Sequence, residues 1–146
     1  SETARKELYV LNDAIGEIIE LAVTSFNNHD ILLARTIEPL EQCIDKMKEM
    51  LKTKHIDRLK NGECAIDAGV IFLEILTNLE RIADHCSNIA VAMIEVAADK
   101  FDTHEYLANV KHGGSVKFEQ RYEKYRGRYT FPPEAYSEPA ENQAEG

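Results

Sequence analysis

The sequence predicts an all-α fold, an antiparallel three-helix bundle with a C-terminal helical and irregular extension. Three long segments place apolar residues at alternating steps of three and four, the spacing of one face of an α-helix. The chain has only seven glycines and four prolines in 146 residues, fewer than a turn-rich β protein needs. A chain of this length forms one domain, so the three segments are expected to share one core.

The first helix is expected from about Glu2 to Phe26. Residues 27–30 are polar and end it. Asp30 then suits the N-cap of the next helix, because its carboxylate can accept hydrogen bonds from free backbone N–H groups. The apolar line of this first helix is Leu8, Leu11, Ile15, Ile18, Ala22 and Phe26.

The second helix is expected from Asp30 to about Lys60. Pro39 lies inside it and cannot donate a helical hydrogen bond, so a kink is predicted near residues 35–40. Gly62 follows, and glycine suits the left-handed conformation that often ends a helix. The apolar line is Leu33, Ile37, Leu40, Ile44, Met47 and Leu51.

The third helix is expected from about Cys64 to Ala98 and is the most apolar. Beside its first apolar line runs a second, made of Ile75, Ile82, Ile89 and Val96. A stripe this wide faces two neighbours rather than one. The first line is Phe72, Leu76, Leu79, Ala83, Cys86, Ala90, Met93 and Ala97.

The pattern weakens after Asp99, where residues 101–115 are expected to form a short helix or a loop. Residues 117–129 carry aromatic side chains at helical spacing among basic ones. Packing of that aromatic side on the bundle is favoured over a dock for membrane headgroups or a partner. The sequence thus predicts a bundle over residues 1–98, an extension packed on it over 99–131, and a disordered acidic tail over 132–146.

Composition excludes several classes of function. The net charge of −9 argues against a nucleic-acid partner, because phosphate binding needs a basic face. Three widely spaced cysteines form no zinc pattern or disulfide framework, and Cys43 and Cys86 fit small buried hydrophobes in a reducing compartment. No catalytic residue is assigned, since no nucleophile–base arrangement and no glycine-rich phosphate loop is present.

One acidic motif occurs twice. Residues 39–45 contain Glu41 and Asp45, and residues 78–84 contain Glu80 and Asp84, each pair four positions apart and each preceded by leucine. Both pairs flank the apolar line of their helix. Glu41 and Asp45 precede Gly62 by 21 and 17 residues, and Glu80 and Asp84 follow it by 18 and 22. In an antiparallel hairpin these distances bring all four carboxylates to one height and one side.

Four clustered carboxylates repel one another unless a positive charge neutralises them. A hard or borderline divalent cation, or ferric iron, fits such an all-oxygen site. The alternative is a solvated acidic face that Arg35 or Arg81 compensates. His85 points about 100° away from Asp84 and is expected to be a surface or interface residue rather than a ligand.

Residues 76–90 (LTNLERIADHCSNIA) resemble the signature of PhoU-like domains. The pairs Glu41/Asp45 and Glu80/Asp84 match that family's metal motif, E(D)xxxD. The region His55–Gly62 resembles the version attached to bacterial Na⁺/phosphate cotransporter proteins. The resemblance covers about residues 5–98, a single three-helix repeat, whereas full PhoU proteins carry two in tandem.

The resemblance implies a cytoplasmic regulator of phosphate uptake at the inner face of the membrane. It implies that the acidic motifs hold iron or another multinuclear metal centre, with zinc, nickel, manganese and magnesium as further candidates. The expected partner is a membrane-embedded phosphate transporter, either a separate protein or a part of the same parent chain with its spans ahead of Ser1. The sequence lacks an initial methionine, as a processed protein or a piece of a longer one would.

A single repeat leaves one bundle face exposed, so a homo-oligomer is expected. The rival hypothesis is a helical association or dimerisation module of a membrane transporter that binds no metal. A di-iron oxidase bundle is disfavoured, because no Glu-x-x-His spacing is present.

Overall fold

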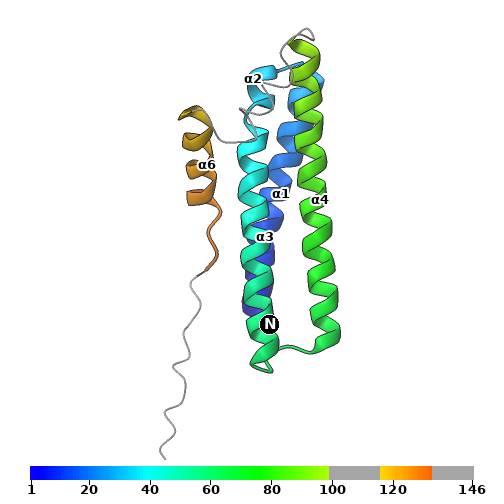
Figure 1. Cartoon of the computed structure of the whole chain (residues 1–146), viewed down its shortest axis with the longest axis vertical. Coiled ribbons are helices and arrows are strands. Elements are labelled where there is room, and N and C mark those ends of the chain that lie inside the picture. Colours follow the sequence, from blue (N-terminus) through cyan, green and yellow to red (C-terminus); the bar gives the residue numbers. More distant parts are fainter. Residues whose placement is uncertain (99–115, 133–146) are drawn as a thin grey trace, which may run out of the picture.

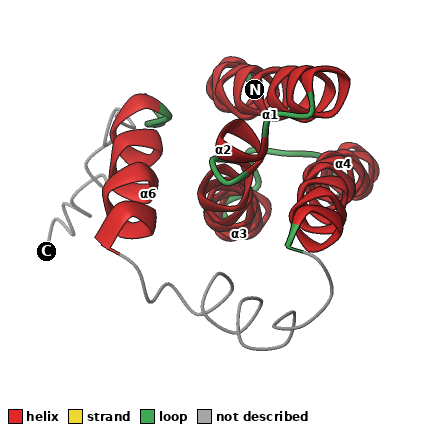
Figure 2. Ribbon diagram, turned by 90° about the horizontal axis from the view of Figure 1, so that it is seen from above, coloured by secondary structure: helices red, strands yellow, loops and turns green. Residues whose placement is uncertain are grey.

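The structure is a computed structural model that describes residues 1–98 and 116–132. In these residues it contains helices and no strand, which confirms the predicted all-α class. Three long helices lie side by side, with α3 antiparallel to α1 and α4, and seen end-on they form a triangle (Figures 1 and 2). The helices are α1 (Glu2–Asn28), α2 (Ile31–Ala34), α3 (Ile37–Lys60), α4 (Ile66–Ala97) and α6 (Val116–Arg128).

The core is built largely from the predicted apolar lines. The prediction was wrong for Phe26, which was placed in the apolar line of the first helix but is 58% exposed. At 100° per residue it lies about 80° around α1 from Ile18, at the edge of the buried stripe. Ala97 is exposed in the last turn of α4. The fully buried apolar side chains of the three long helices include Leu11, Ile18, Ile37, Leu40, Ile44, Leu51 and Leu76.

The predicted second helix is two helices. It is interrupted at Arg35 and Thr36, within the stretch where the sequence predicts a kink, and α3 begins at Ile37. Pro39 therefore lies in the first turn of α3, where a missing N–H costs no helical hydrogen bond. Asp30 is the N-cap of α2, and its carboxylate accepts a hydrogen bond from the N–H of Leu33 at 2.9 Å, as predicted.

The turn from α3 to α4 allows the two helices to approach closely. Gly62 has φ +72°, the left-handed conformation predicted for it. A few residues later, Gly69 of α4 lies against His55 of α3, and a Cβ atom at position 69 would come within 2.8 Å of His55 Nε2. The His55 ring is buried and lies 4.7 Å from the ring of Phe72.

A buried ion cluster joins the start of α1 to the end of α3. Glu7 is fully buried, and its carboxylate accepts hydrogen bonds from Lys54 Nζ and Arg58 Nη1, each at 2.9 Å. The guanidinium of Arg58 also lies 5.9 Å from the centre of the Phe72 ring. Buried charges are tolerated where they are paired in this way, and the pairing joins the first turns of α1 to the last turns of α3.

Helix α6 packs against α3 on the outside of the bundle (Figure 2). Phe118 and Tyr125 are buried there, and Arg128 donates hydrogen bonds to the Glu17 carboxylate of α1 at 2.7 and 2.8 Å. Tyr129 also donates to Glu17. The expected short helix or loop over residues 101–115 lies outside the described residues, as does all of the expected disordered tail over 132–146 except Pro132.

Within 1–98 and 116–132, no helix has a segment long and apolar enough to cross a bilayer.

Candidate functional site

The two acidic motifs lie on neighbouring helices. Glu41 and Asp45 belong to α3, and Glu80 and Asp84 belong to α4, which packs antiparallel to α3. Glu41, Asp45 and Glu80 are half-buried, whereas Asp84 is exposed. The site is therefore at the edge of the α3–α4 interface and open to solvent.

Lys48 links the two motifs. Its Nζ atom lies 3.7 Å from Asp45 Oδ1 on its own helix and 3.8 Å from Glu80 Oε2 on α4. The same Nζ is 3.6 Å from Glu49. The ammonium group thus supplies positive charge between an acid of the first motif and an acid of the second.

Glu41 shows that the carboxylates influence one another. Burial, then the charges of Glu38, Asp45, Asp84 and Glu80, raise the pKa of Glu41 from 4.5 to about 7. Both effects disfavour the ionised carboxylate. The fold therefore keeps negative charge here that Lys48 leaves partly uncompensated, and the electrostatic coupling includes all four residues that the sequence singled out.

A further carboxylate of the site was not predicted. Glu38 is buried, and the hydroxyl group of Ser87 on α4 donates a hydrogen bond to it. Helical spacing could have identified both residues, because Glu38 precedes Glu41 by three positions and Ser87 follows Asp84 by three. The signal in the sequence is an acid one position after Ile37, a residue of the apolar line.

The geometry of the cluster is not that of a formed metal site. In the part of the chain that the structure describes, no group of three or more His, Cys, Asp or Glu side chains is arranged so that it could hold a metal ion. Asp84 instead accepts a hydrogen bond from Asn88 at 3.1 Å, and His85 is exposed. The donor chemistry suits a hard cation, but binding requires the side chains to turn toward one another.

The cysteines offer no reactive thiol near these acids. Cys43 and Cys86 are buried in the core, as expected. Burial raises the pKa of the Cys43 thiol to about 11 and also raises that of Cys86. Little thiolate is present at neutral pH, so neither residue is a nucleophile or a ready metal ligand.

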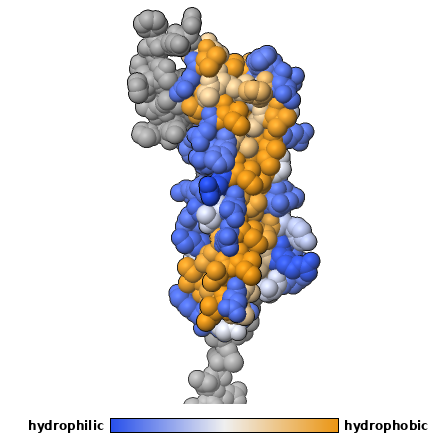
Figure 3. All heavy atoms as spheres, turned by 90° about the vertical axis from the view of Figure 1, so that its right-hand side faces the viewer, coloured by the Kyte–Doolittle hydropathy of each residue, from blue (hydrophilic) through white to orange (hydrophobic). Residues whose placement is uncertain are grey.

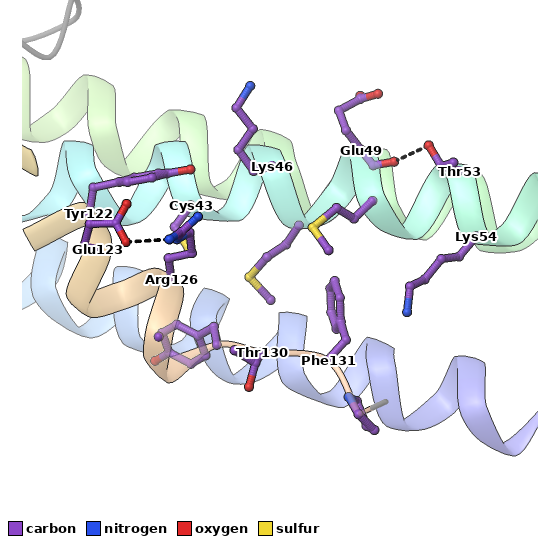
Figure 4. Close-up of a pocket in the computed structure, with 15 residues that line it drawn as sticks. Cys43, Lys46, Glu49, Thr53, Lys54, Tyr122, Glu123, Arg126, Thr130 and Phe131 are labelled. Carbon is purple, nitrogen blue, oxygen red and sulfur yellow. Dashed lines mark hydrogen bonds and ion pairs between the residues drawn. The ribbon is translucent and has the colours of Figure 1, made fainter. Parts of the chain in front are cut away.

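A groove of about 1250 Å³ lies between α3 and α6. Figure 4 shows Phe131 reaching across it toward α3, and Lys54 Nζ lies 5.5 Å from the centre of the Phe131 ring. Met47, Met50 and Tyr122 add apolar surface, while Arg126 is paired with Glu123 at 2.8 Å. The groove contains neither acidic motif and is separate from the candidate site.

The acidic motifs lie in a region of the chain that matches a known protein family. The family model of the PhoU domain matches residues 9–93, more than half of the chain. The chain belongs to the PhoU domain family. The match includes α3, both acidic motifs and most of α4, so the candidate site of this PhoU domain lies inside the family region.

Two curated relatives match this PhoU domain over part of their own length. One is the phosphate-specific transport system accessory protein PhoU homolog 1 of Thermotoga maritima, 24% identical over 108 residues, which cover 74% of this chain and 46% of the relative. The other is an uncharacterized protein of Deinococcus radiodurans, 28% identical over 90 residues, covering 58% of this chain and 31% of the relative. The chain therefore spans half or less of these relatives. No solved structure matches it.

Proposed function

We propose that this PhoU domain is a non-catalytic regulatory module of a bacterial phosphate transport system. Family membership and the name of the Thermotoga maritima relative support this role. The expected partner is a membrane-embedded phosphate transporter, contacted from the cytoplasmic side by protein–protein interaction. The proposal also makes the domain a homo-oligomer, because apolar residues of α1 and α4 remain exposed.

The proposed signal is a cation bound between the two acidic motifs. The observation that carries it is the position of Lys48, which bridges Asp45 of α3 and Glu80 of α4. A cation of higher charge that displaced this ammonium group would join the two helices through Glu41, Asp45, Glu80 and Asp84. Iron is the first candidate, and zinc, nickel, manganese and magnesium are the others.

Metal titration tests the site. Apo protein should gain thermal stability when each candidate cation is added, by about 2.7 kcal/mol at one hundred times the dissociation constant. The double variant Glu80→Gln/Asp84→Asn should lose that gain. The control Asp13→Asn/Glu20→Gln removes two exposed acids from α1 and should keep it. If no cation shifts the melting temperature of the parent, the metal-free association module replaces this proposal.

Lys48→Met separates a binding site from a merely solvated acidic face. Without metal the variant should be less stable than the parent, because the acids lose their counter-charge. Added cation should stabilise the variant at a lower concentration than it stabilises the parent, since no ammonium group competes with the cation for the carboxylates. A loss of stability that no cation restores would favour the metal-free alternative.

Phosphate uptake by cells tests the regulatory role. Uptake is measured at low and at high external phosphate, with the natural gene carrying either the parent sequence or Glu80→Gln/Asp84→Asn. The proposal expects the two strains to differ in how uptake responds to phosphate supply. Identical responses would contradict it even if the metal site were real.

A further inference from the structure

An apolar band covers one face of the bundle (Figure 3). On α4 it contains Ile71, Ile75, Ile82, Ile89 and Val96, which are between 37% and 82% exposed. Ile75, Ile82 and Ile89 each come one residue before a buried residue of α4. Asp84 comes one residue after a buried residue, Ala83. At 100° per residue these isoleucines face away from the acidic site, toward the α1 side of α4.

Helix α1 continues the band. Glu17 marks the flank of α1 that faces α6, because it binds Arg128. At 100° per residue, Ile19, Val23 and Phe26 lie roughly on the opposite flank, next to α4. Ser25 contacts Met93 across the α1–α4 interface at 3.8 Å, which sets these residues beside the upper half of α4. They are 40%, 53% and 58% exposed.

The described extension leaves this band open. Helix α6 packs on α3, with α3 between it and α4 (Figures 1 and 2). The seam of α4 that faces outward has steps of four and three throughout, the repeat by which one long helix packs along another. It contains no Asp or Glu, and its members are Ile71, Ile75, Asn78, Ile82, His85, Ile89, Ala92 and Val96.

We propose that the band is a two-fold interface with a second copy of this chain. This deepens the proposed self-association by assigning its surface, and it does not depend on the metal site. A two-fold contact uses the same surface on both partners, so an apolar face complements itself. The chain carries a net charge of −9, and two copies therefore approach each other best along the outward seam of α4, which contains no Asp or Glu.

The area of the band suits a stable dimer. The exposed fractions of its eight apolar residues add up to about four whole residues, or roughly 400 Å² if each carries about 100 Å² of apolar side-chain surface. A standard interface buries about 800 Å² per partner, a little more than half of it apolar. A patch of this size lies within the range of about 300–600 Å² of the largest apolar patch on a typical monomer, and such a patch is often a functional surface.

Sedimentation equilibrium of the full chain tests the proposal. The parent should approach twice 16.6 kDa as concentration rises. Ile82→Arg should raise the dissociation constant about ten-fold or more, because each interface would then bury two unpaired charges. Ile56→Arg is the matched control, since Ile56 is 39% exposed against 38% for Ile82 but lies on α3, so it should dimerise like the parent.

Circular dichroism establishes that each variant is folded, and Ile89→Arg replaces Ile82→Arg if the latter is not. A parent that stays monomeric at all concentrations overturns self-association itself and leaves the band to a different protein. A parent dimer that the folded band variant leaves intact overturns only the assignment of the surface, because the copies then meet elsewhere. A dimer lost in the band variants and kept in Ile56→Arg supports the interface.

Discussion

Glu41 carries the clearest pH signature of the candidate site. Its pKa is about 7 in the folded chain against 4.5 ordinarily. Between these values the unfolded chain has released the proton and the folded chain retains it, so rising pH favours unfolding. Stability of the metal-free protein should therefore fall from pH 4.5 to about 7, by about 1–2 kcal/mol after allowance for solvent screening.

The test compares the parent with Glu41→Gln by urea unfolding in the presence of chelator, at a series of pH values across this window. The variant should lack the Glu41 contribution and should be the more stable of the two above pH 7. Parallel curves for the two proteins would show that the fold leaves the Glu41 carboxylate uncoupled from its neighbours.

The sequence predicted that the acidic pairs lie together because helical positions repeat regularly along the chain. The spacing within each motif and the distance of each motif from Gly62 predicted that Glu41/Asp45 and Glu80/Asp84 lie at one edge of α3 and α4. It did not reveal Lys48 as the bridge or Ser87 as the partner of Glu38. Those contacts depend on side chains that meet across helices, which a pattern along one helix does not encode.

Among the helices, the apolar lines predicted which face of each long segment is buried. They did not predict that Glu7 is buried, because an acid in an apolar line is tolerated only when a distant helix supplies its partners. Those partners are Lys54 and Arg58, about fifty residues further along the chain. Aromatic spacing likewise predicted a helix near residues 117–129, but not that it packs on α3.

The contact between α3 and α4 depends on Gly69. Gly69→Ala should lower the free energy of unfolding by about 1 kcal/mol. A Cβ atom would meet His55 at 2.8 Å and Leu59 at 3.3 Å, at an overpacking cost of about 1–3 kcal/mol, partly offset by the higher helix propensity of alanine. Gly16→Ala is the control, because nothing lies within 4 Å of its added Cβ.

The control variant should gain about 0.5–1 kcal/mol, the ordinary benefit of alanine over glycine inside a helix. Chemical denaturation of both variants measures the difference. A stabilising Gly69→Ala would mean that His55 moves aside freely and that the close approach of the two helices is not a constraint.

At the scale of the whole molecule, the described residues present three separate surfaces. Helix α6 covers α3, the acidic site occupies the edge between α3 and α4, and the apolar band lies on α1 and α4. These surfaces are separate, so cation binding and self-association can be altered independently. Variants of Glu80 and Asp84 are expected to leave the oligomeric state unchanged.

Shortening the chain to end at Ala98 distinguishes the roles of the extension. The shortened chain should lose about 2–4 kcal/mol, because Phe118 and Tyr125 no longer bury their rings and Arg128 no longer pairs with Glu17. It should still self-associate, because α6 packs on α3 and leaves the band untouched.

Light scattering on both chains measures self-association, after circular dichroism has shown that the shortened chain is folded. If it is not folded, Tyr125→Ala in the full chain weakens the α6 contact without removing the segment. Association that appears only after shortening would show that residues 99–146 cover the band in the full chain, and the two-fold interface would then be wrong.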